Sequence, residues 1–99
     1  MRLQPSAIQT IRDVVAAECG HGAEVRLFGS RLDDNARGGD VDLHVLLPRD
    51  VENPVWLAAL LAGRIERRLE GRKVDVRLVT PSTVRMSVDE VAFHDGQLL

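Results

Sequence analysis

Residues 28–43 read FGSRLDDNARGGDVDL and separate two hydrophobic runs of the chain. The first run ends in Gly29, a polar loop with glycines follows, and the second run opens with Asp40 and Asp42. Alternate residues of a strand point to the same face of the sheet, so both carboxylates are expected on one face. The short link between the two runs predicts that they are neighbouring antiparallel strands.

Hydrophobic spacing outside this stretch predicts the remaining elements. Ser6 with Gln9, and Ser87 with Glu90, have the spacing of capping boxes at helix starts. The expected order α-β-β-α-β-α, with a parallel crossover between residues 41 and 79, predicts an α+β fold. We expect a small mixed sheet of three or four strands with helices packed mainly on one face. Helices are expected over 6–20, 54–70 and 87–95, and strands over 24–28, 40–47 and 73–79.

The overall composition limits the classes of protein to be considered. Ninety-nine residues predict a single domain spanning 1–99. The net charge of -2 gives no general attraction to nucleic acid, so no direct nucleic-acid partner is expected. Cys19 is the one cysteine, which fits a reducing cytoplasm. No signal peptide and no membrane-spanning run is recognised, so we expect a cytoplasmic protein without a membrane partner.

A third carboxylate is expected beside the first two. Asp75 lies near the start of the strand over 73–79, and parallel neighbouring strands start at the same edge of a sheet. Asp40, Asp42 and Asp75 should therefore lie together and repel one another. A divalent cation with hard oxygen ligands, most often Mg²⁺, relieves such repulsion and also binds phosphate. The sequence predicts a metal site at these three residues.

The loop between the two strands has the features of a phosphate site. Gly29 lets a phosphate approach the backbone closely, and Ser30 adds a hydroxyl donor. Arg31 supplies a charge-assisted donor, and Gly39 gives the returning turn its conformational freedom. A phosphate site at Gly29, Ser30, Arg31 and Gly39, next to a metal site, indicates a nucleoside triphosphate bound through Mg²⁺.

Three other side chains have two readings each. His44 lies on the face of Asp42 and either lines a base pocket or, as we expect, is a structural histidine. Arg77 either contacts phosphate or pairs with Asp75, and we expect the pair. Trp56 is expected to pack within the protein rather than contact a partner.

The spacing Gly29-Ser30, nine residues, Asp40-Val41-Asp42 and a later Asp75 resembles that of the minimal nucleotidyltransferase (MNT-type) domains of the DNA polymerase beta superfamily. The resemblance covers nearly the whole chain and implies a nucleotidyltransferase-like fold. The loop has nine residues where ten is the commonest length in the family.

This resemblance implies an activity and a role for each matching residue. Asp40 and Asp42 would bind two Mg²⁺ ions with ATP or another nucleoside triphosphate. Asp75 would complete one metal site and act as, or position, the base for the acceptor hydroxyl. Gly29 and Ser30 would hold the β- and γ-phosphates during in-line attack on the α-phosphorus, with pyrophosphate leaving.

The resemblance also implies a partner. MNT-type domains often accompany a HEPN-domain protein in toxin–antitoxin pairs, in which the MNT chain transfers AMP to a tyrosine of its partner. The leading hypothesis is therefore a protein adenylyltransferase acting as an antitoxin. Two alternatives remain: a non-catalytic partner-binding module with the same fold, and a small-molecule nucleotidyltransferase that acts as a homodimer.

Overall fold

The computed structural model describes residues 3–29 and 40–99 of the chain. These residues form three helices and four strands in the expected order, with one short strand added at the C-terminal end. The elements are α1 (Pro5–Cys19), β1 (Glu24–Phe28), β2 (Val41–Leu46), α2 (Pro54–Arg68), β3 (Val74–Val79), α3 (Ser87–Asp95) and β4 (Gln97–Leu98).

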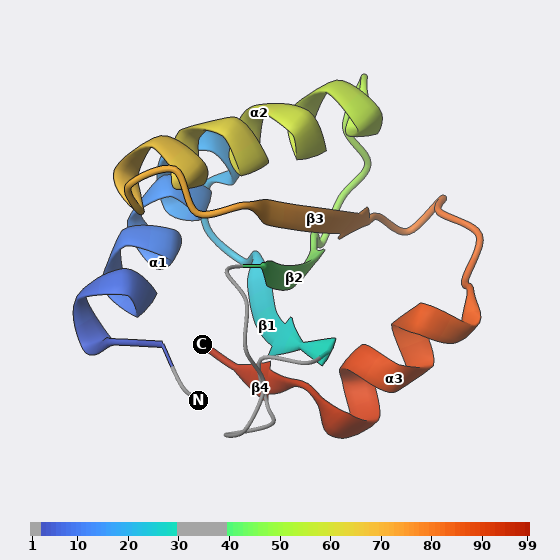
Figure 1. Ribbon diagram of the computed structural model, residues 1–99. Coiled ribbons are helices and arrows are strands. Elements are labelled where there is room, and N and C mark those ends of the chain that lie inside the picture. Colours follow the sequence, from blue (N-terminus) through green and yellow to red (C-terminus); the bar gives the residue numbers. More distant parts are fainter. Residues whose placement is uncertain (1–2, 30–39) are drawn as a thin grey trace.

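The strands form one mixed sheet in the order β3-β2-β1-β4 (Figure 1). β1 pairs antiparallel with both β2 and β4, while β2 and β3 are parallel. The predicted α+β class and both predicted strand pairings are confirmed. β4 has only two residues, which is too short to produce a recognisable alternation in the sequence.

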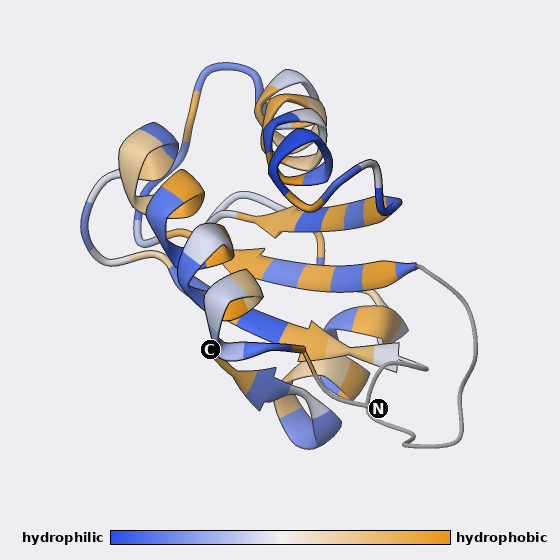
Figure 2. Cartoon of the chain, turned by 60° about the vertical axis from the view of Figure 1, so that its left-hand side comes forward, coloured by the Kyte–Doolittle hydropathy of each residue, from blue (hydrophilic) through white to orange (hydrophobic). Residues whose placement is uncertain are grey.

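One face of the sheet forms the hydrophobic core. Val41, Leu43 and Val45 of β2 alternate with polar residues and are fully buried. Figure 2 shows the same alternation as hydrophobic and hydrophilic stripes along the strands. α1 and α2 cover this face with side chains such as Ile11 and Leu61. Each large side chain that is fully buried contributes about 1.5–3 kcal/mol, so this face accounts for much of the stability.

α3 lies on the opposite face of the sheet from α1 and α2 (Figure 1). Its Phe93 ring packs edge-on against the ring of His44, a β2 residue that points away from the core face, at 4.9 Å between centroids. Two of the three helices thus share one face, which confirms the expected arrangement. The face under α3 is also the one that carries the candidate site residues.

The helix starts differ in detail from the prediction. α1 begins at Pro5 after Gln4, and no side chain caps it. The capping box expected at Ser6 and Gln9 is therefore wrong, because the helix starts one residue earlier. Gln9 instead donates to Asp13, one turn further along the helix, at 2.8 Å.

The start of α2 is as predicted from the sequence, but the exposure of Trp56 is not. The backbone amide of Trp56 donates to the Asn53 side chain at 3.1 Å, and Pro54 opens the helix. The Trp56 side chain was expected to pack within the protein, yet 61% of its surface is exposed. That expectation was wrong, because the buried stripe of α2 runs through Leu57 and Leu61 and leaves Trp56 on a flank.

Within the described residues, none of the helices has the length and hydropathy needed to cross a lipid bilayer.

Candidate active site

Two of the three predicted carboxylates lie directly opposite each other in the sheet. Asp42 of β2 is the register partner of Asp75 of β3. Neighbouring strands are about 4.8 Å apart, and partnered residues of a parallel pair point to the same face. Asp75 is exposed and Asp42 is half-buried. The buried, fully enclosed Val41 fixes this orientation, because its side chain occupies the core on the other face.

The charges around Asp42 show that the carboxylates are close. Burial, followed by the negative charges of Asp75 and Asp40, raises the pKa of Asp42 above its ordinary value. The positive charge of Lys73, which lies just before β3, opposes this shift. Asp40 precedes β2 and is exposed. Two of the carboxylates that the sequence singled out, Asp40 and Asp75, therefore act electrostatically on the third, Asp42, with one lysine nearby.

Gly29 approaches the same carboxylate from the end of β1. Its φ angle is +78°, a conformation that residues with a side chain rarely adopt. A methyl group built on Gly29 would lie 2.6 Å from Oδ2 of Asp42, far inside normal contact distance. The absence of a side chain at Gly29 thus serves two purposes, the backbone turn and the space for the carboxylate. The exposed backbone of Gly29 lies directly beside Asp42, and we call this place the notch at Gly29.

The rest of the predicted phosphate site cannot be compared with the structure. Ser30, Arg31 and Gly39 lie outside the described residues. Among residues 3–29 and 40–99, no group of three or more His, Cys, Asp or Glu side chains is arranged to hold a metal ion. The carboxylate oxygens of Asp40, Asp42 and Asp75 are nonetheless the hard donors that Mg²⁺ prefers.

The next pair on this face of the same two strands lies under α3 and shares an acidic partner. His44 of β2 is the register partner of Arg77 of β3, and both contact Asp89 of α3. Nε2 of His44 lies 2.9 Å from Oδ1 of Asp89. Arg77 donates from Nε to Oδ1 at 3.1 Å and from Nη2 to Oδ2 at 2.9 Å. His44 is fully buried, which confirms the structural role expected for it.

The expected pair between Arg77 and Asp75 is wrong. The guanidinium is committed to Asp89 and also donates to the carbonyl oxygen of Val84 at 3.2 Å. Its hydrogen bonds to Asp89 raise the pKa of Arg77. They also hold the pKa of Asp89 well below its usual range, with smaller contributions from the Met86 amide and His44, although burial opposes the shift.

Sequence reasoning missed Asp89 because it placed the N-cap of α3 one residue too late, although the predicted range 87–95 of the helix is correct. The predicted capping pair was Ser87 with Glu90. In the structure α3 follows Met86, and Asp89 accepts from the Met86 amide at 2.8 Å. An acidic residue in a first helical turn is favourable through its interaction with the helix dipole alone. Nothing in the local sequence therefore marks Asp89 as buried.

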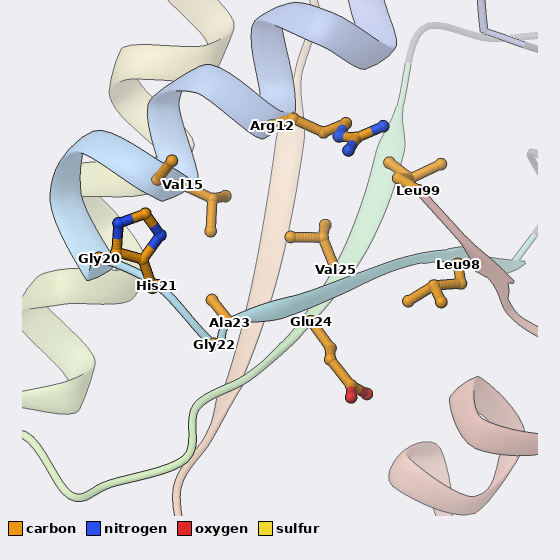
Figure 3. Close-up of a pocket in the computed structure, with 11 residues that line it drawn as sticks. Arg12, Val15, Gly20, His21, Gly22, Ala23, Glu24, Val25, Leu98 and Leu99 are labelled. Atoms are coloured by element: carbon orange, nitrogen blue, oxygen red, sulfur yellow. The ribbon is translucent and has the colours of Figure 1, made fainter.

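The structure also contains a cavity remote from the carboxylates. It has a volume of about 330 Å³ and lies between the C-terminal end of α1, the start of β1 and the chain end at Leu99 (Figure 3). Figure 3 shows its polar side chains, Arg12, His21 and Glu24, pointing in different directions. Because they do not converge on a common point, this cavity lacks the organisation of a binding site.

Comparison with known proteins identifies the class of this domain. No curated protein matches the chain at a significant level. The family model of the nucleotidyltransferase domain matches residues 8–97, a span that contains Gly29, all three carboxylates and Asp89. The chain belongs to the nucleotidyltransferase domain family.

Proposed function

We propose that the chain is a Mg²⁺-dependent adenylyltransferase that transfers AMP from ATP to a hydroxyl group of a partner protein. One observation carries the proposal: Asp42 and Asp75 are register partners on one sheet face, beside the backbone notch at Gly29. Membership of the nucleotidyltransferase family supplies the class of reaction.

The residues present fit a divalent cation by their chemistry. Asp40, Asp42 and Asp75 offer carboxylate oxygens only, and their mutual repulsion is the kind that a cation relieves. Three protein ligands are not preassembled among the described residues, so phosphate oxygens of the nucleotide are expected to complete the coordination. Bound Mg²⁺ would neutralise charge on the triphosphate and on the oxygens that enter and leave.

In this proposal each residue has a distinct task. Asp40 and Asp42 hold the cation together with the nucleotide. Asp75 lies across the ladder from Asp42, where it can accept the proton of the attacking hydroxyl or orient that hydroxyl. The new bond joins the acceptor oxygen to the α-phosphorus, the bond from the α-phosphorus to the bridging oxygen breaks, and pyrophosphate leaves. The notch at Gly29 admits the phosphates close to the backbone.

A protein acceptor fits the exposure of the site. Asp40, Asp75 and Gly29 are all exposed among the described residues, so a side chain carried by another protein can approach them. The likeness to MNT-type domains indicates a HEPN-domain protein as the partner and a tyrosine hydroxyl as the acceptor. In such a pair this chain would be the antitoxin.

The direct test compares ATP labelled on the α-phosphate with ATP labelled on the γ-phosphate. The chain is incubated with each, with Mg²⁺ and with the protein encoded next to it. We expect the α-label on the partner protein and the γ-label only in pyrophosphate. Asp42→Asn should abolish labelling. Asp13→Asn, an equally small change at an exposed α1 position on the far side of the sheet, should leave it intact.

Other outcomes separate the alternatives. Label that appears on a small molecule would replace the protein acceptor with a small-molecule one. No transfer of label, combined with unchanged neutralisation of the partner by Asp42→Asn, would favour a non-catalytic partner-binding module.

A further inference from the structure

An arginine lies within reach of the candidate metal site but is directed away from it. Arg77 and Asp75 are two residues apart on β3 and share a face, at about 6.5–7 Å along the strand. An arginine side chain is long and flexible enough to cover that distance. Unrestrained, its guanidinium would be attracted to Asp75 and Asp42, because both carboxylates lack a protein cation in direct contact among the described residues.

Asp89 prevents that pairing in the structure. It binds two edges of the Arg77 guanidinium, at 3.1 Å through Nε and 2.9 Å through Nη2. The carboxylate is itself fixed, because it also contacts Nε2 of buried His44 at 2.9 Å and the Met86 amide at 2.8 Å. All four contacts come from groups of the sheet or of the α3 start, so Asp89 has little freedom to follow Arg77 elsewhere.

We propose that Asp89 is a positioning residue that holds Arg77 away from Asp42 and Asp75, and so keeps both carboxylates available to a divalent cation. The cation belongs to the proposed function, and the inference rests on it to that extent. The position of Arg77 does not depend on the proposed function, and it can be tested without metal.

The charges that act on Asp42 and on Arg77 agree with the separation of Arg77 from the carboxylates. Asp75, Asp40 and Lys73 are the charged groups that shift the pKa of Asp42. The charge of Arg77 acts instead on Asp89. A buried carboxylate at position 89 thus compensates Arg77, the arginine two residues from Asp75 on β3, whose own side chain is 27% exposed.

The first test measures the affinity for Mn²⁺ by calorimetry in the full chain. We expect Asp89→Asn to weaken Mn²⁺ binding about tenfold, because the released guanidinium adds a positive charge beside the carboxylates. The double variant Asp89→Asn with Arg77→Met should bind Mn²⁺ within about twofold of the unmodified chain, since the competing charge is gone. A double variant as weak as the single one would overturn the proposal.

A second pair of variants leaves Asp89 intact and guards against failure of Asp89→Asn to fold. Lysine cannot bind a carboxylate with two parallel donors, so Arg77→Lys should be held less firmly than arginine. We expect Arg77→Lys to bind Mn²⁺ more weakly than Arg77→Met, although lysine is the more conservative substitution. The opposite order would contradict the proposal.

The third readout separates this inference from the proposed function. A crystal structure of Asp89→Asn without metal should place the Arg77 guanidinium within hydrogen-bonding distance of Asp75 or Asp42. If Arg77 stays in its present position, the inference fails even where nucleotidyl transfer is observed. If the unmodified chain binds no Mn²⁺ but Arg77 moves as expected, the proposed function fails and the role of Asp89 stands.

Discussion

Two neighbouring pairs on the same face of the sheet differ in every electrostatic respect. Asp42 and Asp75 are like-charged; Asp75 is exposed and Asp42 is half-buried. His44 and Arg77, the next pair but one along the strands, share Asp89 beneath α3. The first pair is repulsive without a ligand. In the second pair Arg77 and Nε2 of His44 bind Asp89, while Nδ1 of His44 has no hydrogen-bond partner among the described residues. On the proposed function, the first pair binds the cation and the second pair stabilises the fold.

The largest expected effect is on activity at the exposed pair. Asp42→Ala should reduce nucleotidyl transfer roughly 10⁴-fold, because it removes a ligand of the ion that stabilises the transition state. Its free energy of unfolding should not fall, since the removed charge is repelled in the folded protein. Transfer assays and chemical denaturation of the same preparation check both statements. A variant that is unfolded as well as inactive would contradict the prediction that Asp42 serves activity and not stability.

The buried pair should respond in the opposite way. Asp89→Ala removes the partner of buried His44 and of the Met86 amide, and each group left unsatisfied costs about 1–3 kcal/mol, whereas the partly exposed Arg77 is free to turn to Asp75. Urea denaturation measures this loss. The exposed Asp13→Ala serves as the matched control and should change stability by less than about 0.5 kcal/mol. An equal loss of unfolding free energy in the two variants would show that the hydrogen bonds of Asp89 do not stabilise the fold.

Gly29 lies at the end of β1 beside Asp42, and its substitution should have an intermediate effect. Gly29→Ala forces a side chain into a positive φ angle, at a cost of about 1–2 kcal/mol, and pushes against Oδ2 of Asp42. Gly71→Ala is the control, because Gly71 also has a positive φ angle but open space around it. Both should lose stability, but only Gly29→Ala should lose transfer activity. Equal activity in the two variants would contradict a role for the notch.

The pH dependence of stability should have opposite signs at the two pairs. The pKa of Asp89 is lowered in the folded protein, so its stabilising effect is complete above the unfolded pKa of about 3.9 and is lost as pH falls through the folded value. The stability difference between the unmodified chain and Asp89→Asn should therefore shrink in acid. Thermal unfolding between pH 7 and 3 measures it, and a difference independent of pH would be inconsistent with an ionised Asp89.

The smallest effect concerns Asp42→Asn in the absence of metal. The pKa of Asp42 is raised, so its charge destabilises the fold above the folded pKa, and that penalty disappears as pH falls toward about 3.9. At pH 7 the variant should be about 0.5 kcal/mol more stable, or about 2–4 °C in Tm. Added Mg²⁺ should stabilise the unmodified chain but not the variant. A lower Tm for the variant at pH 7 without metal would argue against repulsion at this pair.

The contrast also explains what could be predicted from the sequence. Asp42 and Asp75 were predictable, because strand alternation places them on one face and parallel pairing sets them side by side. Strand alternation and the pairing of neighbouring strands suffice for that prediction. The partner of Arg77 was not predictable, because Asp89 reaches it only through the docking of α3 on the sheet. An error of one residue in the N-cap of α3, Ser87 in place of Met86, was enough to hide it.

The exposed Trp56 illustrates a different failure. Its position early in an amphipathic helix suggested packing, but the helix turns its apolar stripe of Leu57, Leu61 and Ile65 toward the sheet. A side chain one position before the stripe is displaced by about 100° around the helix axis. The periodicity therefore predicted the buried face correctly, and a position early in the helix was not enough to place Trp56 on that face.

The central claim is that Asp40, Asp42 and Asp75 bind a cation together with a nucleotide beside Gly29. Anomalous diffraction from crystals grown with Mn²⁺ and an ATP analogue with a methylene bridge between the α- and β-phosphates tests it most directly. The account predicts a manganese peak within ligand distance of the three carboxylates, with the phosphates against the Gly29 backbone. Bound nucleotide with no manganese at these carboxylates would contradict it.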